Sequence, residues 1–349
     1  MIKVNFLKAN NGDCIHISYN FKNIIIDSGI GATFSLKKSN RPKQYGELKS
    51  VIDNIKDKNE KIDLLIITHW DDDHIGGVLK WFKEDAENAK SLIKNIWFNS
   101  GILINKHFNS QEASENVDEI DSKFDPSTSI KQGIFFEKLI LDNNISNTHV
   151  INTDTNTDDI LDGVEFTILS PTDTELKKLL TLWEKSPYNP STSSSNDYDK
   201  SLNELLENEF KEDSAIHNGS SIAFILKIEG KKMLFLGDAH PSVVVSSLIE
   251  LEYSKEKKLK IDFVKASHHG SKANTSNELL ELIECDKFII STDNSKHGLP
   301  NKETFARIIN KHENCELYFN YPSLINMIFT NEELQSDKFK ALDISEFSL

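Results

Sequence analysis

The sequence lacks the features that would place the protein in a membrane or an oxidising compartment. Its longest apolar runs, such as Leu64 to Ile67 and Ile222 to Leu226, have the length of a strand, far below the ~18 residues of a membrane helix. The N-terminal residues turn polar without the apolar stretch of a signal peptide. The three cysteines, Cys14, Cys285 and Cys315, are widely spaced and form no disulfide framework. We therefore expect a cytoplasmic protein with no membrane partner.

Positive charge, and arginine in particular, is also scarce. The chain of 349 residues has 40 basic and 55 acidic residues, for a net charge of −15, and only Arg41 and Arg307 are arginines. An acidic chain repels nucleic acid at long range, and bidentate arginine clamps on phosphates are nearly unavailable. The composition disfavours a broad basic surface for nucleic acid. It leaves open a local site where metal cations supply the positive charge.

The apolar content is large enough for a sizeable core, since 38% of the residues are hydrophobic. Short β-rich runs dominate the first and last thirds, each interspersed with segments of helical spacing. This layout predicts two sheets packed face to face with helices outside. We expect a single domain over residues 1–349, with insertions at about 105–145 and 186–215. Polar composition predicts a loop or flap at 105–130 and a surface loop at 186–201.

The strongest chemical signal follows the apolar strand predicted at 62–68. There His69-Trp70-Asp71-Asp72-Asp73-His74 leads through Ile75 into Gly76-Gly77. Three adjacent aspartates are most often a solvated charge run. However, these aspartates lie at the end of a buried strand, where functional sites are commonly built. Imidazoles and carboxylates together are ligands for zinc, manganese or iron, so the cluster predicts a metal site.

This motif resembles the H-x-H-x-D-H metal signature of the metallo-β-lactamase-fold hydrolases, with Asp71 in the place of the second histidine. The H-x-D-x-D-H form resembles the hydrolase domain of the bacterial competence (DNA-uptake) channel protein and its stand-alone relatives. Further segments match that branch in chain order: Asn11-Gly12-Asp13, Ile26-Asp27-Ser28-Gly29, Asn218-Gly219-Ser220-Ser221, Leu236-Gly237-Asp238 and Ser267-His268-His269-Gly270-Ser271. The resemblance implies an α/β protein with a four-layer αββα sandwich and a two-metal site at one edge.

Two divalent ions, Zn or Mn, are the expected cofactors. A two-metal site needs about six protein ligands and one bridging carboxylate. With Asp238 as the bridge, we expect His69, Asp71 and His217 at the first ion. At the second ion we expect Asp73, His74 and His269. The competence-type branch has only an asparagine near position 217, so His217 is either a ligand or a bystander. The metals would lower the pKa of a shared water to roughly 7 and provide hydroxide.

Several neighbouring residues have expected roles around these ligands. Asp27 would hydrogen-bond a ligating histidine. His268 and His269 cannot both point the same way from an extended backbone, so we take His269 as the ligand and His268 as a proton donor or substrate contact. Lys272 and Asn218 are the expected substrate-binding residues.

The chain departs from the family pattern at the C-terminal Gly-His-Pro motif. Here the segment reads His297-Gly298-Leu299-Pro300, with leucine at the family's histidine position. Either His297 replaces that histidine or the contact is lost. We assign catalytic roles to Asp73, His268 and His297.

The resemblance implies a phosphodiesterase or nuclease that acts on nucleic acid or nucleotides through a metal-bound hydroxide. An alternative is a small-molecule hydrolase, either a lactonase or a thioesterase, whose substrate suits the acidic chain. A third possibility is a regulatory subunit with protein partners in a bacterial defence system. The net charge of −15 predicts single-stranded or short substrates over long duplex. The sequence gives no indication of oligomeric state.

Overall fold

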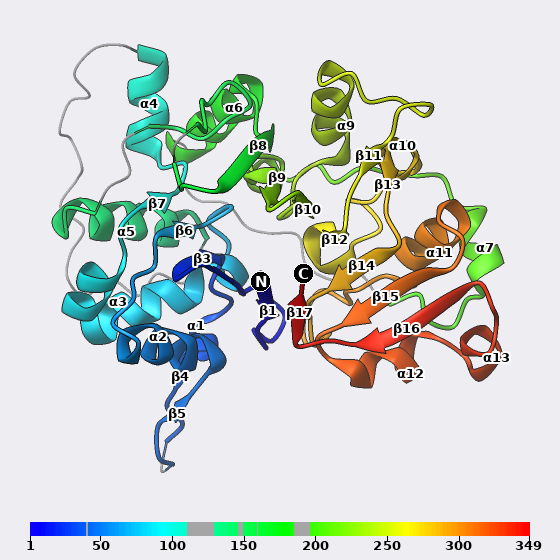
Figure 1. Cartoon of the computed structure of the whole chain (residues 1–349), viewed down its shortest axis with the longest axis horizontal. Helices are drawn as coiled ribbons and strands as arrows, with labels where there is room; N and C mark the ends of the chain where they lie inside the picture. Colours follow the sequence, from blue (N-terminus) through cyan, green and yellow to red (C-terminus); the bar gives the residue numbers. More distant parts are fainter. Residues whose placement is uncertain (40, 110–128, 146–148, 159, 185–195) are drawn as a thin grey trace.

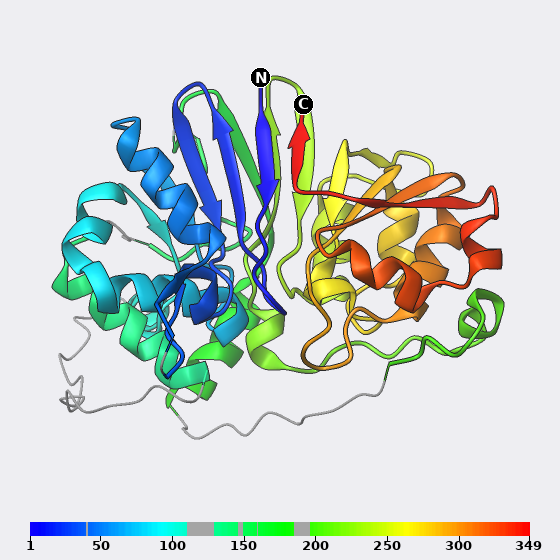
Figure 2. The ribbon, with the colours of Figure 1, turned by 90° about the horizontal axis from the view of Figure 1, so that it is seen from below.

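The computed structural model describes residues 1–39, 41–109, 129–145, 149–158, 160–184 and 196–349. Within these residues, two β-sheets pack against each other and helices cover their outer faces (Figures 1 and 2). The strands of the first sheet are, in spatial order, β17 (Glu346–Ser348), β1 (Lys3–Phe6), β2 (Ile15–Tyr19), β3 (Lys22–Ile26), β6 (Leu64–Ile66) and β7 (Ile96–Trp97). The strands of the second are β16 (Phe339–Asp343), β15 (Cys315–Phe319), β14 (Lys287–Ile290), β12 (Phe263–Lys265), β10 (Lys231–Phe235), β9 (Ala223–Ile228) and β8 (Val164–Ser170).

Two short sheets and the helices complete the described fold. The short sheets pair β4 (Ser35–Leu36) with β5 (Gln44–Tyr45) and β11 (Leu259–Lys260) with β13 (Ile283–Glu284). The helices of the first half are α1 (Gly31–Phe34), α2 (Glu47–Asp57), α3 (Asp72–Leu92), α4 (Gly101–Asn109), α5 (Ser129–Asp142) and α6 (Asp173–Glu184). Those of the second half are α7 (Leu202–Leu206), α8 (Ile216–Gly219), α9 (Pro241–Glu250), η1 (Ser267–Gly270), α10 (Asn277–Leu282), α11 (Lys302–Lys311), η2 (Pro322–Leu324), α12 (Ile325–Ile328) and α13 (Asn331–Leu334). None of the helices within the described ranges is long and apolar enough to cross a bilayer.

Three separate apolar clusters show that the fold has four layers. The central cluster lies between the sheets and includes edge-to-face contacts of Phe263 with Phe6 and with Phe235, each at 5.7 Å between ring centroids. A second cluster joins the outer face of the first sheet to helices such as α2, α3 and α5. A third joins the outer face of the second sheet to α9, α10 and α11. The predicted αββα sandwich is confirmed.

Parallel strand pairs bring the chemical motifs to one edge of the sandwich. Strands β3 and β6 pair in parallel register, so the residues after Ile26 and Ile66 leave the sheet side by side. In the second sheet, β10, β12 and β14 are also parallel neighbours. Their carboxyl ends lead into Asp238, His268 and Ser291, respectively. Both sheets therefore deliver polar loops to the same edge.

The predicted insertions are described only in part. The loop prediction for 105–130 is wrong at its start, because α4 continues to Asn109 with Ile104 buried in the core. Residues 110–128 lie outside the described part of the chain, as do 185–195, which hold most of the loop predicted at 186–201. The described remainder of the second insertion contains the short helix α7.

His312 provides a test of the third apolar cluster, to which Phe288 belongs. Its ring packs 5.2 Å from that of Phe288 and is 8% exposed, and burial together with nearby Lys258 lowers its pKa to about 4. In the unfolded chain the imidazole of His312 is protonated near pH 6.5, whereas in the folded protein it is protonated only near pH 4. This contribution to stability is therefore fully present above pH 6.5 and is lost as the pH falls toward 4.

We predict that His312→Gln reduces the acid sensitivity of folding. Between pH 7 and pH 4, the free energy of unfolding of the wild type should fall by about 1–3 kcal/mol more than that of the variant. Urea unfolding at a series of pH values measures both. Equal losses in the two proteins would show that His312 titrates normally when folded.

Candidate metal centre

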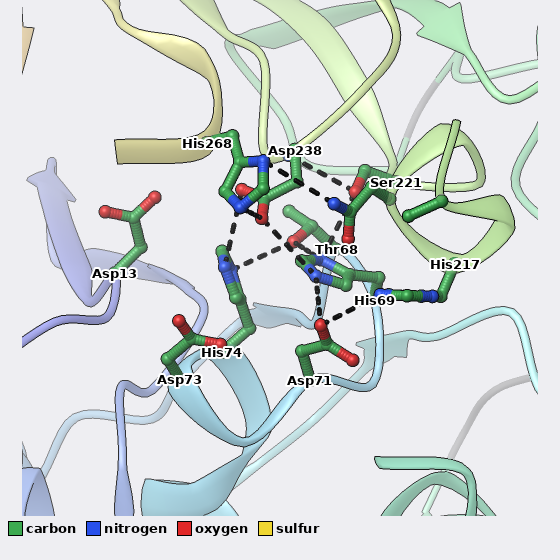
Figure 3. Close-up of polar contacts among 12 residues, drawn as sticks. Asp13, Thr68, His69, Asp71, Asp73, His74, His217, Ser221, Asp238 and His268 are labelled. Atoms are coloured by element: carbon green, nitrogen blue, oxygen red, sulfur yellow. Dashed lines mark hydrogen bonds and ion pairs between the residues drawn. The ribbon is translucent and has the colours of Figure 1, made fainter. Parts of the chain in front are cut away.

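The loops at the shared edge bring five histidines and several aspartates together. Figure 3 shows four of these histidines, His69, His74, His217 and His268. Asp238, 3% exposed, lies at the centre of this group. Its Oδ1 is 3.4 Å from Nε2 of His74, and its Oδ2 is 3.7 Å from Nε2 of His69. The two carboxylate oxygens thus face two different sets of side chains, as a bridging ligand requires.

The first set surrounds His69 and includes Asp71 and also His217, whose role the sequence left open. Nε2 of His217 lies 3.1 Å from Oδ2 of Asp71, and the same oxygen is 3.9 Å from Nε2 of His69. Helix α8 supplies His217, and the loop after β6 supplies the other two. The structure therefore brings His217 and Asp71 into the group that was predicted for the first ion.

The second set surrounds His74. Nε2 of His269 is 3.4 Å from Oδ2 of Asp73, the first-turn aspartate of α3. Potential ligand atoms of Asp13, His74, Asp238 and His269 all lie within 4.8 Å of one another, and all four residues are buried. The structure thus brings together every residue predicted for the second ion and adds Asp13.

Hydrogen bonds at Nδ1 fix the direction in which the histidines point. Nδ1 of His74 donates to Oδ2 of Asp27 at 2.8 Å, as predicted for Asp27. Nδ1 of His269 donates to the carbonyl of Ser291 at 3.1 Å, which requires the proton on that nitrogen. Both rings then present the Nε2 lone pair to the carboxylates.

His69 is held in the same manner by two hydroxyls. Its Nδ1 lies 3.2 Å from Oγ1 of Thr68 and 3.2 Å from Oγ of Ser221. The Thr68 hydroxyl donates to Asp27, so its oxygen can accept from His69. One carboxylate, Asp27, therefore orients two histidines.

The arrangement fits bound cations. Among the residues that the structure describes, the buried Nε2 atoms of His69, His74 and His269 and Oδ1 of Asp238 have no hydrogen-bond partner. Buried polar atoms are rarely left in this state. A divalent ion between the nitrogen and oxygen atoms would satisfy both, and a mixed imidazole and carboxylate set suits zinc or manganese.

The pKa values of the histidines reflect the concentrated negative charge. Burial opposes protonation of His269, but Asp13, Asp73 and Asp238 outweigh it and raise its pKa to about 10. For His74, Asp238 and Asp27 likewise overcome burial and raise the pKa well above the ordinary value. Burial dominates at His69, where, with repulsion from His74, it lowers the pKa to about 4. The potential that protonates His74 and His269 also attracts metal cations.

The assumption of an extended backbone at His268 and His269 is wrong. Their backbone is not extended, because φ is 45° at His268 and 53° at His269, in the left-handed region. Nε2 of His268 consequently also faces the group, 3.5 Å from Oδ2 of Asp238. The side chain of His268 is 24% exposed, against 2% for His269. His268 therefore lies on the open side of the group.

Asp213, which the site prediction missed, and Asn274 hold His268 in place. Nδ1 of His268 is 3.1 Å from Oδ1 of Asn274 and 3.5 Å from Oδ2 of Asp213. Asn218, predicted to bind substrate, is 4% exposed and donates to Asp213 at 2.7 Å. Asn218 thus holds Asp213, which in turn contacts Nδ1 of His268. Asp213 lies in the predicted insertion, with no motif around it to mark it.

Asp13 is a further residue that the site prediction missed, although it lies in the matched Asn-Gly-Asp segment. Its carboxylate contacts Nδ1 of His269 at 3.4 Å and pairs with the fully buried ammonium of Lys265. Those two cations overcome burial and hold the pKa of Asp13 well below its usual range. In the same segment, Asn11 donates to Asp73 at 3.0 Å. The segment has the composition of a turn, so its sequence did not indicate the contacts of Asp13 with His269 and Lys265.

Lys272 is engaged with a residue outside this group. The ammonium of Lys272 pairs with Glu303 of α11 at 3.4 Å. His297 is exposed on the loop between β14 and α11, whereas Leu299, at the family's histidine position, is 6% exposed. The replacement of the family histidine by His297 stays a prediction.

Comparison with known proteins agrees with the fold. Residues 9–292 match the sequence model of the Metallo-beta-lactamase superfamily. No curated protein matches the chain. Similar solved structures include the metallo-beta-lactamase fold protein YhfI from Bacillus subtilis, with 8% identity, a TM-score of 0.41 and coverage of 100% of both chains. Another is the metallo hydrolase Igni18 from Ignicoccus hospitalis, with 13% identity, a TM-score of 0.39 and coverage of 100% of this chain and 99% of that one.

We predict that Asp27→Asn weakens metal binding by about 10- to 100-fold. Oδ1 of Asp27 accepts from the Thr68 backbone amide and Oδ2 accepts from the Thr68 hydroxyl and His74, and the amide of Asn replaces one of these two acceptors by a donor. The matched control is Asp72→Asn in the same motif, since Asp72 accepts from Gln132 at 2.8 Å. The control should keep nearly the wild-type affinity. Competition with a chromophoric chelator measures both variants. A similar affinity for all three proteins would contradict the orienting role of Asp27.

We also predict that Gly77→Ala destabilises the loop that carries the ligands. A Cβ at Gly77 would lie 2.1 Å from the carbonyl oxygen of Ser28, the residue after Asp27. At Gly31 the nearest atom would be 3.8 Å away, so Gly31→Ala is the control. Thermal unfolding should show a loss of about 1–3 kcal/mol for Gly77→Ala and almost none for Gly31→Ala. Comparable stabilities would refute the close contact.

Proposed function

The chain belongs to the metallo-β-lactamase superfamily, and from this premise we propose that it is a two-metal hydrolase of phosphodiester bonds in nucleic acid or nucleotides. The superfamily consists of metal-dependent hydrolases. The observation that carries the two-metal proposal is the geometry of Asp238, whose oxygens face His74 on one side and His69 on the other.

The proposed ligands divide between the two oxygens of Asp238. His69, Asp71 and His217 would hold one ion, and Asp73, His74 and His269 the other. Zinc and manganese both suit this set. When bound, the ions would supply a water of lowered pKa and neutralise charge on the attacked group. The Nδ1 hydrogen bonds of His74 and His269 keep their Nε2 atoms directed inward.

Exposure indicates the side from which a substrate would approach. The side chains of Asp71, Asp73 and His268 are 24%, 18% and 24% exposed, respectively. His69 and His74 are almost fully buried behind them. A substrate would therefore lie against His268. We propose that Nε2 of His268 donates a proton to the leaving oxygen, with its ring held through Nδ1 by Asn274 and Asp213.

The resemblance to the competence-type hydrolase domain supports the phosphodiester substrate. One observation favours the second candidate, a lactonase or thioesterase: Lys272, the expected phosphate contact, already pairs with Glu303. Zinc or manganese as the ion, a cytoplasmic location and protein partners in a bacterial defence system stay predictions from the sequence.

Parallel initial rates distinguish these candidates. The substrates are a single-stranded oligonucleotide, a duplex of equal length, a cyclic dinucleotide and a homoserine lactone, each with zinc and with manganese. We expect hydrolysis of the single strand or the dinucleotide. Rapid lactone hydrolysis with no cleavage of any phosphodiester would replace the proposed substrate class.

We predict that Asp238→Ala lowers the metal content from two ions to one or fewer per chain and abolishes hydrolysis, because the variant lacks the bridge. Asp162→Ala, at an aspartate whose side chain is 99% exposed, should keep the wild-type content. Elemental analysis gives the metal content, and circular dichroism checks folding. Two tightly bound ions in folded Asp238→Ala would contradict the bridging role.

A further inference from the structure

The β4–β5 hairpin has a charge opposite to that of the protein. Residues 36–45 include Lys37, Lys38, Arg41 and Lys43 and no acidic residue. The whole chain has a net charge of −15, so subtraction of these four positive charges leaves −19 on the remainder. The hairpin also holds Arg41, one of only two arginines; the other, Arg307, is buried and paired with Glu303.

The cations of this hairpin are available to a partner. Figure 1 shows the hairpin projecting from the body of the molecule beyond α1 and α2. Lys37, Lys38 and Arg41 are exposed, and the described part of the chain places no acidic side chain within ion-pair distance of them. By contrast, Lys43 at the base pairs with Glu84 of α3, which also accepts from Ser35. The base is therefore anchored while the outer cations are left for a ligand.

An exposed aromatic ring accompanies these cations. Tyr45 is 61% exposed, and the ammonium groups of Lys43 and Lys49 lie 5.3 and 5.4 Å from its ring centroid. Lys43 and Lys49 themselves pair with Glu84 and Asp53, so Lys37, Lys38 and Arg41 are the cations left for phosphates. Exposed cations near an open aromatic ring are the elements with which proteins hold single-stranded nucleic acid, through phosphate contacts and base stacking. A membrane surface fits poorly, because the described residues beyond β4 include no large apolar side chain before Tyr45.

The hairpin and the metal centre are connected through helix α3, which carries Glu84, the partner of Lys43. Helix α3 begins at the ligand motif, and Glu84 lies twelve residues after Asp72, about 18 Å along the helix. A strand of several nucleotides could contact both places, whereas a dinucleotide could not. The negative net charge of the rest of the chain would repel the additional phosphates of a duplex.

We propose that the β4–β5 hairpin, through Lys37, Lys38, Arg41 and Tyr45, binds single-stranded nucleic acid and directs it to the metal centre. This inference rests on the proposed phosphodiesterase function and names its substrate class. The hairpin supplies the phosphate contacts that Lys272, paired with Glu303, does not offer.

The test neutralises the hairpin in the metal-loaded protein, with K37Q/K38Q/R41Q. The control K90Q/K200Q/K338Q removes the same charge from exposed lysines elsewhere. Binding of a fluorescent phosphorothioate single strand, which keeps its charge and resists hydrolysis, is followed by anisotropy over a range of salt concentrations. We expect the hairpin variant to bind at least about tenfold more weakly at low salt. The plot of log affinity against log salt should become shallower by about 2, because each of the three lost phosphate contacts contributes ~0.7 to the magnitude of the slope. The control should bind like the wild type.

Cleavage rates separate this proposal from the proposed function. The hairpin variant should have a raised KM for a long single strand and an unchanged kcat/KM for a dinucleotide. Equal binding by the variant and the wild type, or an equal loss in the control, would overturn the role of the hairpin. Dinucleotide cleavage by the wild type would then still support the phosphodiesterase. Hairpin-dependent binding without any cleavage would support the hairpin and refute the phosphodiesterase. Equally tight hairpin-dependent binding of polyglutamate would also overturn the proposal, because an acidic protein would then be the partner.

Discussion

The structure depends on the concentration of negative charge at one buried edge of the sandwich. Asp13, Asp27, Asp73 and Asp238 approach one another there, three of them at 3% exposure or less. Carboxylates removed from water are costly unless cations compensate them. Protein groups provide part of the compensation, through Lys265 beside Asp13 and through the histidines. The Nε2 atoms without hydrogen-bond partners and the raised pKa values of His74 and His269 reflect the remaining negative charge, which bound cations would offset.

The fold meets this requirement through parallel strands in two facing sheets. Each sheet alone ends in loops with too few ligands for two ions. Face-to-face packing sets the His69 to His74 loop of the first sheet against Asp238 and His269 of the second. The contact of Gly77 with Ser28 and the hydrogen bonds of Asp27 keep the first loop in place. The packing that stabilises the sandwich therefore also positions the proposed ligands.

Sequence reasoning succeeded where the chemical information was local. Apolar periodicity indicated two facing sheets with helices outside, and short motifs that resemble the metallo-β-lactamase family implied the αββα sandwich and the grouping of His69, Asp71, Asp73, His74, Asp238 and His269. It failed where long-range contacts decide the outcome. Asp213 reaches His268 across 55 residues, and Asp13 reaches Lys265 across 252 residues. The direction of His268 depended on a left-handed backbone that its sequence does not reveal. The pairing of Lys272 with Glu303 was hidden for the same reason.

Anomalous diffraction from crystals of the metal-loaded protein tests the central claim most directly. Data collected on either side of the absorption edges of zinc and manganese would locate each ion and identify it. The account predicts two peaks, one on each side of the Asp238 carboxylate. One should lie among His69, Asp71 and His217, and the other among Asp73, His74 and His269. A single peak, or two peaks that do not share Asp238, would contradict it.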